Sequence, residues 1–390
     1  MPLEIVLLSL SSIGMLAGIA LTRWIHSSHA LDIRVEPTHD VPADSPLVTV
    51  IVPARNEKRN IWRCVQALLS QTYPNYELVV VDDRSTDATP RILEELAQAA
   101  ARLQIVTGVE PPEGWAGKPH ALQQGVARAR GDWLCFVDAD TFAGPELLAS
   151  ALDAAQATSA DLFTILTAQE LGTFWEKAVL PLVFTALSFG FPARRVNDPT
   201  KPDAIANGQF ILIKHQVYSA VGGHAAVRRR IDEDKALAES VKRAGYRLVI
   251  ADGRSVARTR MYTSLAEIWE GWTKNIYLGL RDRLWLLLLG AIVGLLGALL
   301  LPLWLAGGLY WLLTTGQPVP ALVSLEALLV WGYLLAARLQ ASRFYQISPL
   351  YALTLPLGSL VFTLMMAASA FNVLARRGVT WKGRTYAGSP

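Results

Sequence analysis

The sequence predicts an α/β protein with a doubly wound, mostly parallel sheet, helices on both faces, and transmembrane helices at both ends of the chain. Short apolar segments alternate with segments of helical period from residue 48 to about residue 250, which is typical of strand–helix–strand units. Acidic residues follow several of the predicted strands directly, which places a ligand site at the carboxyl ends of those strands. Long apolar stretches begin and end the chain.

Composition limits the classes of protein that the chain can represent. Its 390 residues give room for one large α/β domain with additional elements, and 52% of them are hydrophobic while 18% are charged. Such a chain is too apolar for a purely soluble enzyme. The net charge of +3 and the lack of a long basic stripe argue against nucleic-acid binding. Cys64 and Cys135 form neither a disulfide framework nor a zinc spacing, so we expect buried thiols in a reducing compartment.

The amino-terminal residues 1–23 are expected to form a transmembrane anchor. Residues 3–22 are almost continuously apolar, and Glu4 is their only charge. Arg23 follows the apolar run instead of preceding it, which favours a retained anchor with its carboxyl end in the cytoplasm over a cleaved signal peptide. Residues 24–46 are polar and contain three prolines, so we interpret them as a linker.

Residues 47–280 are predicted to form the soluble α/β domain together with interfacial helices. Its strands are expected at residues 48–53, 76–81, 103–107, 133–137, 161–169, 206–213 and 246–251. Its helices are expected at residues 60–70, 89–102, 119–130, 146–157, 217–221, 231–244 and 264–277. The apolar stretch at residues 174–191 contains Pro181 and two charges, which favours an interfacial or substrate-lining helix over a transmembrane span.

Residues 281–376 are predicted to form a carboxyl-terminal membrane region with two or three spans, at residues 284–313, 321–337 and 347–375. Glu326 lies inside the second span and should face other helices instead of lipid. Arg338, Arg343 and the basic tail, residues 377–390, all favour the cytoplasmic side, although one span separates them. Either the last stretch is a re-entrant element, which its prolines would suit, or one basic cluster lies outside.

Asp138 and Asp140 follow the predicted buried strand at residues 133–137. On an extended chain, residues two apart point to the same side, so both carboxylates can face one point. Two oxygen ligands at the end of a parallel strand suit a divalent cation that keeps waters and shares phosphate oxygens with a substrate. An isolated Asp-x-Asp is also common in turns, so the metal interpretation depends on the other motifs.

Five short motifs occur in a fixed order along the chain, at residues 53–57, 81–87, 114–118, 138–140 and 233–234. Together they resemble the family-2 glycosyltransferases, which have the GT-A fold and invert the configuration of the transferred sugar. The resemblance covers about residues 48–272. The set is specific, although each motif is short, and it implies an enzyme that takes its sugar from a nucleotide donor.

The resemblance implies a nucleotide-sugar-binding role for six residues at the strand ends. Pro53, Arg55 and Glu57 match the first nucleotide-contacting loop. Asp82 and Asp83 match the position that holds the uracil or ribose, where carboxylates can accept hydrogen bonds from an imide N–H or from hydroxyls. An ordinary cap and turn is the structural alternative for that pair. Lys118 matches a lysine that approaches the diphosphate.

The resemblance also implies the residues that perform the chemistry. Asp140 matches the direct ligand of Mg²⁺ or Mn²⁺, and Asp138 matches a residue that contacts the sugar or the metal. The cation neutralises charge on the departing nucleoside diphosphate. Asp234 matches the general base, and Glu233 beside it is assigned to the acceptor side. Acids at the start of a helix also complement its dipole, which is the structural alternative for Glu233 and Asp234.

The chain departs from the family pattern after the predicted base. Many processive members carry an Arg-Trp pair there, and residues 270–275 of this chain lack it, which favours transfer of a single sugar. Lys274 still offers a cation to the diphosphate, so we assign it to the donor site. Trp269 and Trp272 are assigned to the acceptor side, with membrane-interface anchoring as the alternative.

Two further motifs, at residues 258–262 and 381–384, resemble a membrane-anchored subgroup of carotenoid (chlorobactene-type) glucosyltransferases that is related to ceramide and hopanoid glycosyltransferases. The expected function is transfer of one sugar, glucose from UDP-glucose, to the hydroxyl of a carotenoid, hopanoid or sphingolipid. The resemblance implies an integral protein of the bacterial inner membrane with a cytoplasmic catalytic domain. The alternatives are transfer to a polyisoprenyl phosphate, and a non-catalytic scaffold that has kept the fold.

Overall fold

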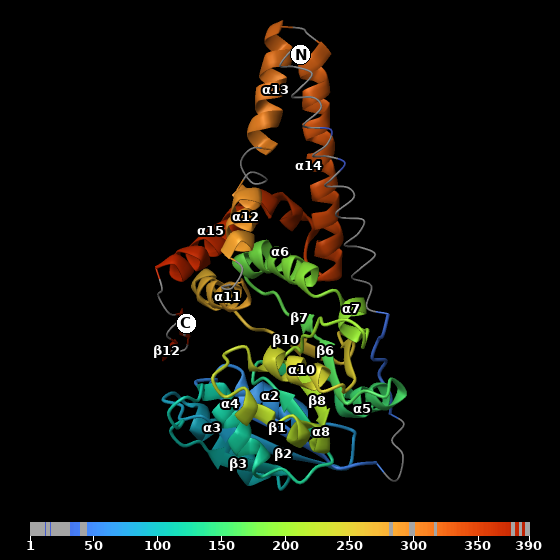
Figure 1. Cartoon of the computed structure of the whole chain (residues 1–390), viewed down its shortest axis with the longest axis vertical. Helices are drawn as coiled ribbons and strands as arrows, with labels where there is room; N and C mark the ends of the chain where they lie inside the picture. The colour runs from blue at the N-terminus through green and yellow to red at the C-terminus, as the bar shows by residue number, and fades with distance from the viewer. Residues whose placement is uncertain are drawn as a thin grey trace. The chain divides into compact units, whose positions relative to one another are not determined.

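The structure of the chain is a computed structural model, which describes residues 12, 16, 32–39, 45–280, 284–295, 301–315, 318–375, 379–381 and 384–386. The chain divides into two compact units. The catalytic unit comprises residues 29–170 and 191–261, and the helical unit comprises residues 1–28, 171–190 and 262–390 (Figure 1). Apart from Ser12 and Leu16, the predicted anchor at residues 1–23 lies outside the described residues.

The catalytic unit is built around a seven-stranded sheet with the strand order β3-β2-β1-β4-β8-β6-β9. Its strands are β1 (Val48–Ala54), β2 (Tyr76–Asp82), β3 (Leu103–Thr107), β4 (Trp133–Val137), β6 (Leu162–Leu166), β8 (Phe210–Lys214) and β9 (Leu248–Asp252). β8 is antiparallel to both of its neighbours, β4 and β6, and the other pairs are parallel. The prediction of an α/β fold with a mostly parallel sheet is therefore confirmed.

Both faces of the sheet are covered by helices, which explains why its strands are apolar at nearly every position. On one face, Val50, Val52 and Cys135 pack with residues of α2 (Ile61–Leu69), α3 (Thr89–Ala99) and α5 (Leu147–Ala157). On the other face, Ile51 and Phe136 pack with residues of α4 (Gly117–Val126), α7 (Ala193–Asn197), α8 (His215–Ala220) and α10 (Glu233–Arg243). The predicted doubly wound arrangement is thus present.

Three short strands form a second sheet that the sequence pattern did not predict. β5 (Thr141–Ala143), β10 (Ala257–Thr259) and β7 (Ala168–Gln169) pair in the order β5-β10-β7. β5 begins one residue after Asp140, so this sheet continues directly from the Asp-x-Asp motif. The predicted strand at residues 161–169 is in fact split, since β6 belongs to the large sheet and β7 to the small one.

The described part of the predicted linker pairs with the large sheet. Val35 is 1% exposed and donates its N–H to the carbonyl of Asp252, at 2.8 Å. The N–H of Asp252 in turn donates to the carbonyl of Ile33, at 2.9 Å. Residues 32–39 therefore pair with the end of the edge strand β9 instead of forming a plain connection.

The helical unit contains α6 (Phe174–Gly190), α11 (Leu265–Leu280), α12 (Leu284–Leu295), α13 (Leu301–Thr315), α14 (Pro318–Phe344), the 3₁₀ helix η3 (Pro349–Thr354) and α15 (Leu355–Leu374). Among the described residues, one helical segment, Pro349–Leu374, is long and apolar enough to cross a membrane, with a mean hydropathy of 1.8. It supports one candidate span near the carboxyl terminus. The predicted span at residues 284–313 contains two helices, α12 and α13, instead of one. The prediction of spans at both ends of the chain stays a prediction.

Two charged side chains inside the helical unit, Glu326 and Arg338, have protein partners. The hydroxyl of Ser12 donates to the Glu326 carboxylate, as expected for an acid that faces another helix. Arg338 is 3% exposed and donates through Nη2 to the carbonyl oxygens of Lys177 at 2.6 Å and Ala178 at 3.2 Å. Within the predicted tail, β11 (Val379–Trp381) and β12 (Arg384–Tyr386) pair as an antiparallel hairpin.

Candidate active site

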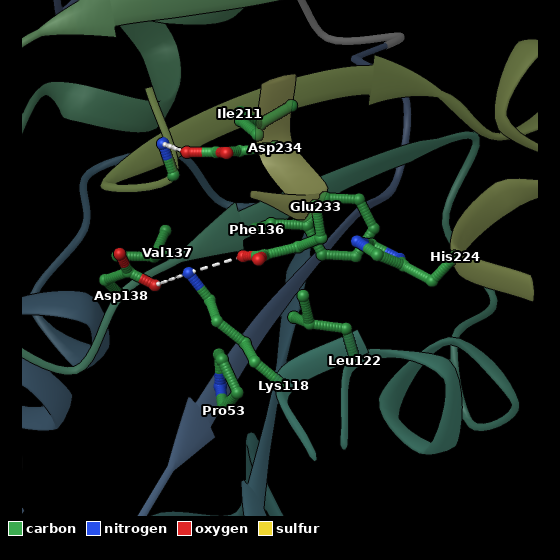
Figure 2. Close-up of a pocket in the computed structure, with 11 residues that line it drawn as sticks. Pro53, Lys118, Leu122, Phe136, Val137, Asp138, Ile211, His224, Glu233 and Asp234 are labelled. Carbon is green, nitrogen blue, oxygen red and sulfur yellow. Dashed lines mark hydrogen bonds and ion pairs between the residues drawn. The ribbon is translucent and has the colours of Figure 1, made fainter. Parts of the chain in front are cut away.

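A pocket lies at the carboxyl ends of β1 and β4, beside the start of α10 (Figure 2). These two strands are parallel neighbours, so their carboxyl ends meet at one edge of the sheet. The pocket is lined by Pro53, Lys118, Leu122, Phe136, Val137, Asp138, Gly208, Ile211, His224, Glu233 and Asp234. Five residues that the sequence motifs singled out therefore line one pocket: Pro53, Lys118, Asp138, Glu233 and Asp234.

Lys118 lies at the centre of the charged part of this pocket. It is the second residue of α4, and its Nζ lies 2.7 Å from Asp138 Oδ1 and 2.8 Å from Glu233 Oε1 (Figure 2). Burial alone would lower the pKa of Lys118, but the negative charges of Asp138, Glu233 and Asp234 outweigh burial and raise its pKa well above the usual value. The ammonium group therefore stays charged and joins a carboxylate from the turn after β4 to one from α10.

Glu233 and Asp234 occupy the first turn of α10, where the helix dipole favours negative charge. Glu233 is 3% exposed, and burial raises its pKa to about 7, with the charge of Asp234 acting in the same direction and Lys118 opposing it. Burial also raises the pKa of Asp234, although the charge of Lys118 and the N–H of Lys235 oppose the shift. The two acids are thus held in a site where ionisation is costly.

Asp234 is fixed in place by two backbone N–H groups. Gly208 donates to Oδ2 at 3.1 Å and Lys235 donates to Oδ1 at 2.7 Å. A Cβ atom on Gly208 would lie 3.0 Å from Asp234 Oδ2 and 3.2 Å from Lys118 Nζ, closer than ordinary van der Waals contact. Glycine at this position therefore lets the backbone approach both charged groups.

Asp138, Ala139 and Asp140 form a turn between β4 and β5, closed by a bond from Thr141 N–H to the Asp138 carbonyl at 3.0 Å. Asp138 and Asp140 therefore lie in a turn and not on the extended chain that the sequence pattern predicted. The negative charges of both acids still affect the same buried group, the thiol of Cys64. Burial raises the pKa of Cys64 well above its usual value, and the charges of Asp140, Glu57 and Asp138 add to this effect.

Asp138 and Asp140 carry the oxygen donors that a divalent cation with further ligands from a substrate would use. Carboxylate oxygens are the donors that Mg²⁺ and Mn²⁺ prefer. Among the residues that the structure describes, no group of three or more His, Cys, Asp or Glu side chains is arranged to hold a metal ion. Asp138 and Asp140 would therefore supply part of a coordination shell, which phosphate oxygens and water would complete.

The predicted nucleotide loop lies at the adjacent ends of β1 and β2. Arg55 Nη1 donates to the Asp83 carbonyl at 2.8 Å, and the same nitrogen lies 4.0 Å from Asp83 Oδ2. Asp82 Oδ1 accepts the N–H of Ser85 at 3.1 Å, so this carboxylate also stabilises the turn, as the structural alternative expected. Glu57 Oε2 accepts from Asn60 Nδ2 at 3.2 Å, at the start of α2.

Three predicted site residues belong to the helical unit instead of the catalytic unit. Trp269, Trp272 and Lys274 all lie on α11. The ring of Trp272 is buried and lies edge-on to Phe184 of α6, at 5.8 Å between centroids, whereas Trp269 is 37% exposed. The roles assigned to these three side chains stay predictions.

The sequence motifs did not identify His224, which also lines the pocket. His224 is 1% exposed, its Nδ1 lies 2.9 Å from the Tyr218 hydroxyl, and its ring stands edge-on to Phe136 at 4.9 Å. Burial lowers its pKa to about 3, and the positive charge of Lys118 adds to this effect. The sequence signal that could have identified His224 is the pair Gly222 and Gly223 directly before it. Both glycines have positive φ and so mark a tight turn that positions the histidine.

Comparison with known proteins identifies the class of enzyme. The chain shares its fold with mannosyltransferase PcManGT from Pyrobaculum calidifontis, whose structure was solved in complex with GDP-Man and Mn²⁺. The TM-score is 0.55 and the sequence identity is 18%, and the match covers 95% of this chain and 99% of that one. It is 28% identical over 263 residues to the 4,4'-diaponeurosporenoate glycosyltransferase of Staphylococcus aureus strain USA300, covering 64% of this chain and 68% of the relative. The homologous protein of the bovine strain RF122 is 26% identical over 87% of this chain and 88% of its own length. The chain is a glycosyltransferase.

The family follows from the same region that forms the site. Residues 49–234 match the family model described as Glycosyl transferase family 2. The matched region contains the central strands from β1 to β8 and ends at Asp234, the predicted base. This region therefore carries a glycosyltransferase family 2 domain, and the resemblance that the five motifs indicated is confirmed.

Proposed function

We propose that this protein transfers one sugar from a UDP-sugar, with glucose as the expected sugar, to a hydrophobic lipid acceptor, and that the transfer inverts the anomeric centre. The observation that carries the proposal is the pocket at the strand ends. It joins a cationic side chain from α4, an acid from the Asp-x-Asp turn and an acid from α10 within one lining. These are the groups that a diphosphate leaving group, a donor sugar and an attacking hydroxyl require.

The donor half of the site lies along the ends of β1, β2 and β4. Arg55 and Asp83 are positioned to hold the nucleoside, since they are already linked to each other across the ends of β1 and β2. Lys118 is positioned to neutralise the diphosphate. Asp138 and Asp140 would hold Mg²⁺ or Mn²⁺, which when bound stabilises negative charge on the departing nucleoside diphosphate.

Asp234 acts as the general base for the acceptor. The N–H groups of Gly208 and Lys235 orient its carboxylate and favour the ionised form that a base requires. Asp234 takes the proton of the acceptor hydroxyl while the hydroxyl oxygen forms a bond to the anomeric carbon. The bond between that carbon and the diphosphate oxygen breaks on the opposite face, and its electron pair leaves with the nucleotide.

The acceptor is proposed to be a carotenoid or another long apolar lipid, which reaches the site from the bilayer. The name of the S. aureus relatives refers to a carotenoid-derived acid, and the helix Pro349–Leu374 is long enough to hold this chain in a membrane. We place the protein in the bacterial inner membrane with the catalytic unit in the cytoplasm.

A second candidate is transfer to an acceptor that is already an anion, such as a lipid carboxylate or phosphate. The name of the relatives denotes a carboxylate. Two arginines, Arg63 and Arg258, lie against Phe142 of β5, the strand that follows the Asp-x-Asp turn. The N–H of Arg260 donates to the Asp140 carbonyl at 3.2 Å, and the charges of Arg63, Arg258 and Arg260 all act on Glu170. Such an acceptor needs no general base, so activity that survives Asp234→Asn would favour this candidate.

The proposal is tested by mass spectrometry of lipid extracts from cells that express the chain and from cells that lack it. We expect lipid species heavier by one hexose only in the expressing cells, and we expect Asp140→Asn to remove them. Identical lipid profiles in both cell lines, obtained with a carotenoid-producing host, would contradict the proposed function.

A further inference from the structure

Lys118 occupies the position of a cation beside Asp138. Its ammonium group lies 2.7 Å from Asp138 Oδ1 and 2.8 Å from Glu233 Oε1, and both contacts are drawn in Figure 2. Asp138 is also one of the two carboxylates that would hold the divalent cation. The same carboxylate therefore has two competing positive partners, one of which is part of the chain.

The charges around Lys118 make this competition strong. The negative charges of Asp138, Glu233 and Asp234 all stabilise the ammonium group. Gly208 leaves room for Lys118 beside Asp138 and Asp234, because a Cβ atom at this position would lie within 3.4 Å of Asp138 Oδ2, Asp234 Oδ2 and Lys118 Nζ. His224 is neutral near pH 7. A divalent cation on Asp138 would repel an ammonium group held this close, because like charges a few ångströms apart in a partly buried pocket interact strongly.

Glu233 provides a second carboxylate with which Lys118 can pair. The Glu233 carboxylate is 3% exposed and comes from α10, whereas Asp138 comes from the turn after β4. The lysine side chain has four flexible methylene groups and a compact charge, so Nζ can leave one carboxylate while it keeps the other. Loss of the Asp138 contact would turn the ammonium group toward an anion that enters the pocket.

We propose that Lys118 is an exchangeable counter-ion that holds Asp138 until a nucleoside diphosphate arrives, and that Glu233 is the positioning residue that retains Lys118 during the exchange. This inference rests on the proposed function, because it assigns the diphosphate of the donor as the anion that draws Lys118 away. It assigns Glu233 to the donor side, in contrast to the acceptor-side role expected from the sequence. Divalent cation and nucleotide then bind cooperatively, and each raises the affinity for the other by the same factor.

Lys118→Gln should change the affinities for cation and nucleotide in opposite directions. Removing the ammonium group frees Asp138, so Mn²⁺ alone should bind about tenfold more tightly. UDP should bind about tenfold more weakly, because its diphosphate loses a cationic partner. Each tenfold change in affinity corresponds to about 1.4 kcal/mol of binding free energy. The measurement is electron paramagnetic resonance titration of the full-length chain in detergent with Mn²⁺, first without and then with UDP. This readout does not depend on sugar transfer.

Three further variants give the experiment its controls. Arg243→Gln removes a positive charge from an exposed position of α10 outside the pocket, so neither affinity should change. Glu233→Gln leaves Lys118 on Asp138, so Mn²⁺ alone should bind no more tightly than to the wild type. In an Asp138→Asn background, Lys118→Gln should no longer raise the affinity for Mn²⁺.

Tighter binding of Mn²⁺ by Lys118→Gln, lost in the Asp138→Asn background, supports the exchange. Unchanged or weaker binding of Mn²⁺ by folded Lys118→Gln overturns it, and so does equal weakening by Lys118→Gln and Glu233→Gln, because that result indicates a structural role only. Absence of sugar transfer alongside the expected Mn²⁺ titrations would instead contradict the proposed function and leave the exchange in place.

Discussion

At the residue scale, burial controls the charge of the side chains that line the pocket. Glu233 and His224 are both almost completely buried, and burial favours the neutral form of each. The shifts have opposite signs, because the neutral form of a carboxyl holds a proton and the neutral form of an imidazole lacks one. Lys118 is the exception, since its three acidic neighbours hold it in the charged form.

His224 predicts a specific dependence of stability on pH. Its pKa is about 3 in the folded chain and about 6.5 when exposed, so between these values the unfolded state binds more protons. The contribution of His224 to the free energy of unfolding therefore falls as the pH is lowered through 6.5, by at most about 1.4 kcal/mol per pH unit. Thermal unfolding at pH 7.5 and 5.5 should show a smaller pH effect for His224→Asn than for the wild type.

The control for this prediction is His39→Asn, which removes a histidine whose side chain is 74% exposed. It should keep the dependence of the wild type. Glu233 has the opposite effect on stability, because its pKa of about 7 in the folded chain lies above its usual 4.5. Its contribution to the free energy of unfolding therefore falls as the pH rises from 5.5 to 7.5. Because Glu233 is present in every variant, comparing the variants at the same two pH values removes its effect. An unchanged pH effect in His224→Asn would contradict the account of the buried imidazole.

The sequence was sufficient to predict those site residues that belong to a local motif. Lys118, Asp138, Glu233 and Asp234 each stand at a strand end or a helix start, and such positions follow from local patterns. His224 and Gly208 could not be predicted in the same way. Their place in the pocket depends on contacts across the fold, such as the bond from Gly208 to Asp234, which joins residues 26 positions apart.

At the element scale, helix α6 shows how two distant residues compensate for each other. Pro181 has no N–H, so the carbonyl of Lys177 one turn earlier lacks its usual helical donor. Arg338 of α14 donates to that carbonyl at 2.6 Å. A positive side chain that the sequence assigned to the cytoplasmic side is thus buried against a helix that contains a proline.

This pairing predicts a non-additive effect on stability. Arg338→Met leaves the Lys177 carbonyl without its arginine partner and should lower the free energy of unfolding by about 1–3 kcal/mol. Pro181→Ala restores an N–H to α6, so the same arginine substitution should cost less in that background. Unfolding of the four variants in detergent, with the exposed Arg343→Met as a control, measures the coupling. Equal costs in both backgrounds would show that the arginine does not replace the missing donor.

The elements that could be predicted are those with a long, regular apolar pattern. The buried run of β4 and the periodic helix α10 are close to their expected bounds. Strands β5, β7 and β10 have two or three residues each, which is too short for a period to be recognised. Their pairing is decided by tertiary contacts, as for Phe142 of β5, which lies opposite Arg258 and beneath the guanidinium group of Arg63.

At the scale of the whole molecule, the chain combines a family-2 catalytic unit with a helical unit that contains a candidate membrane span. The alternation of strands and helices was sufficient to predict the catalytic unit, because that pattern permits few topologies. The number of spans could not be predicted from the sequence in the same way. Basic residues stand on both sides of the last apolar stretch, and one of them, Arg338, has a structural partner instead of a solvent-exposed position.

The most direct test of the central claim is sugar transfer by the purified chain in lipid vesicles that contain a hydroxylated carotenoid, UDP-glucose and Mn²⁺. We expect the wild type to form the glycosylated carotenoid and Asp234→Asn to form it at least about 100-fold more slowly, because a general base contributes a factor of this order. Binding of UDP by Asp234→Asn should stay near that of the wild type, which shows that the variant is folded. Transfer to the hydroxyl by Asp234→Asn at the wild-type rate would contradict the account.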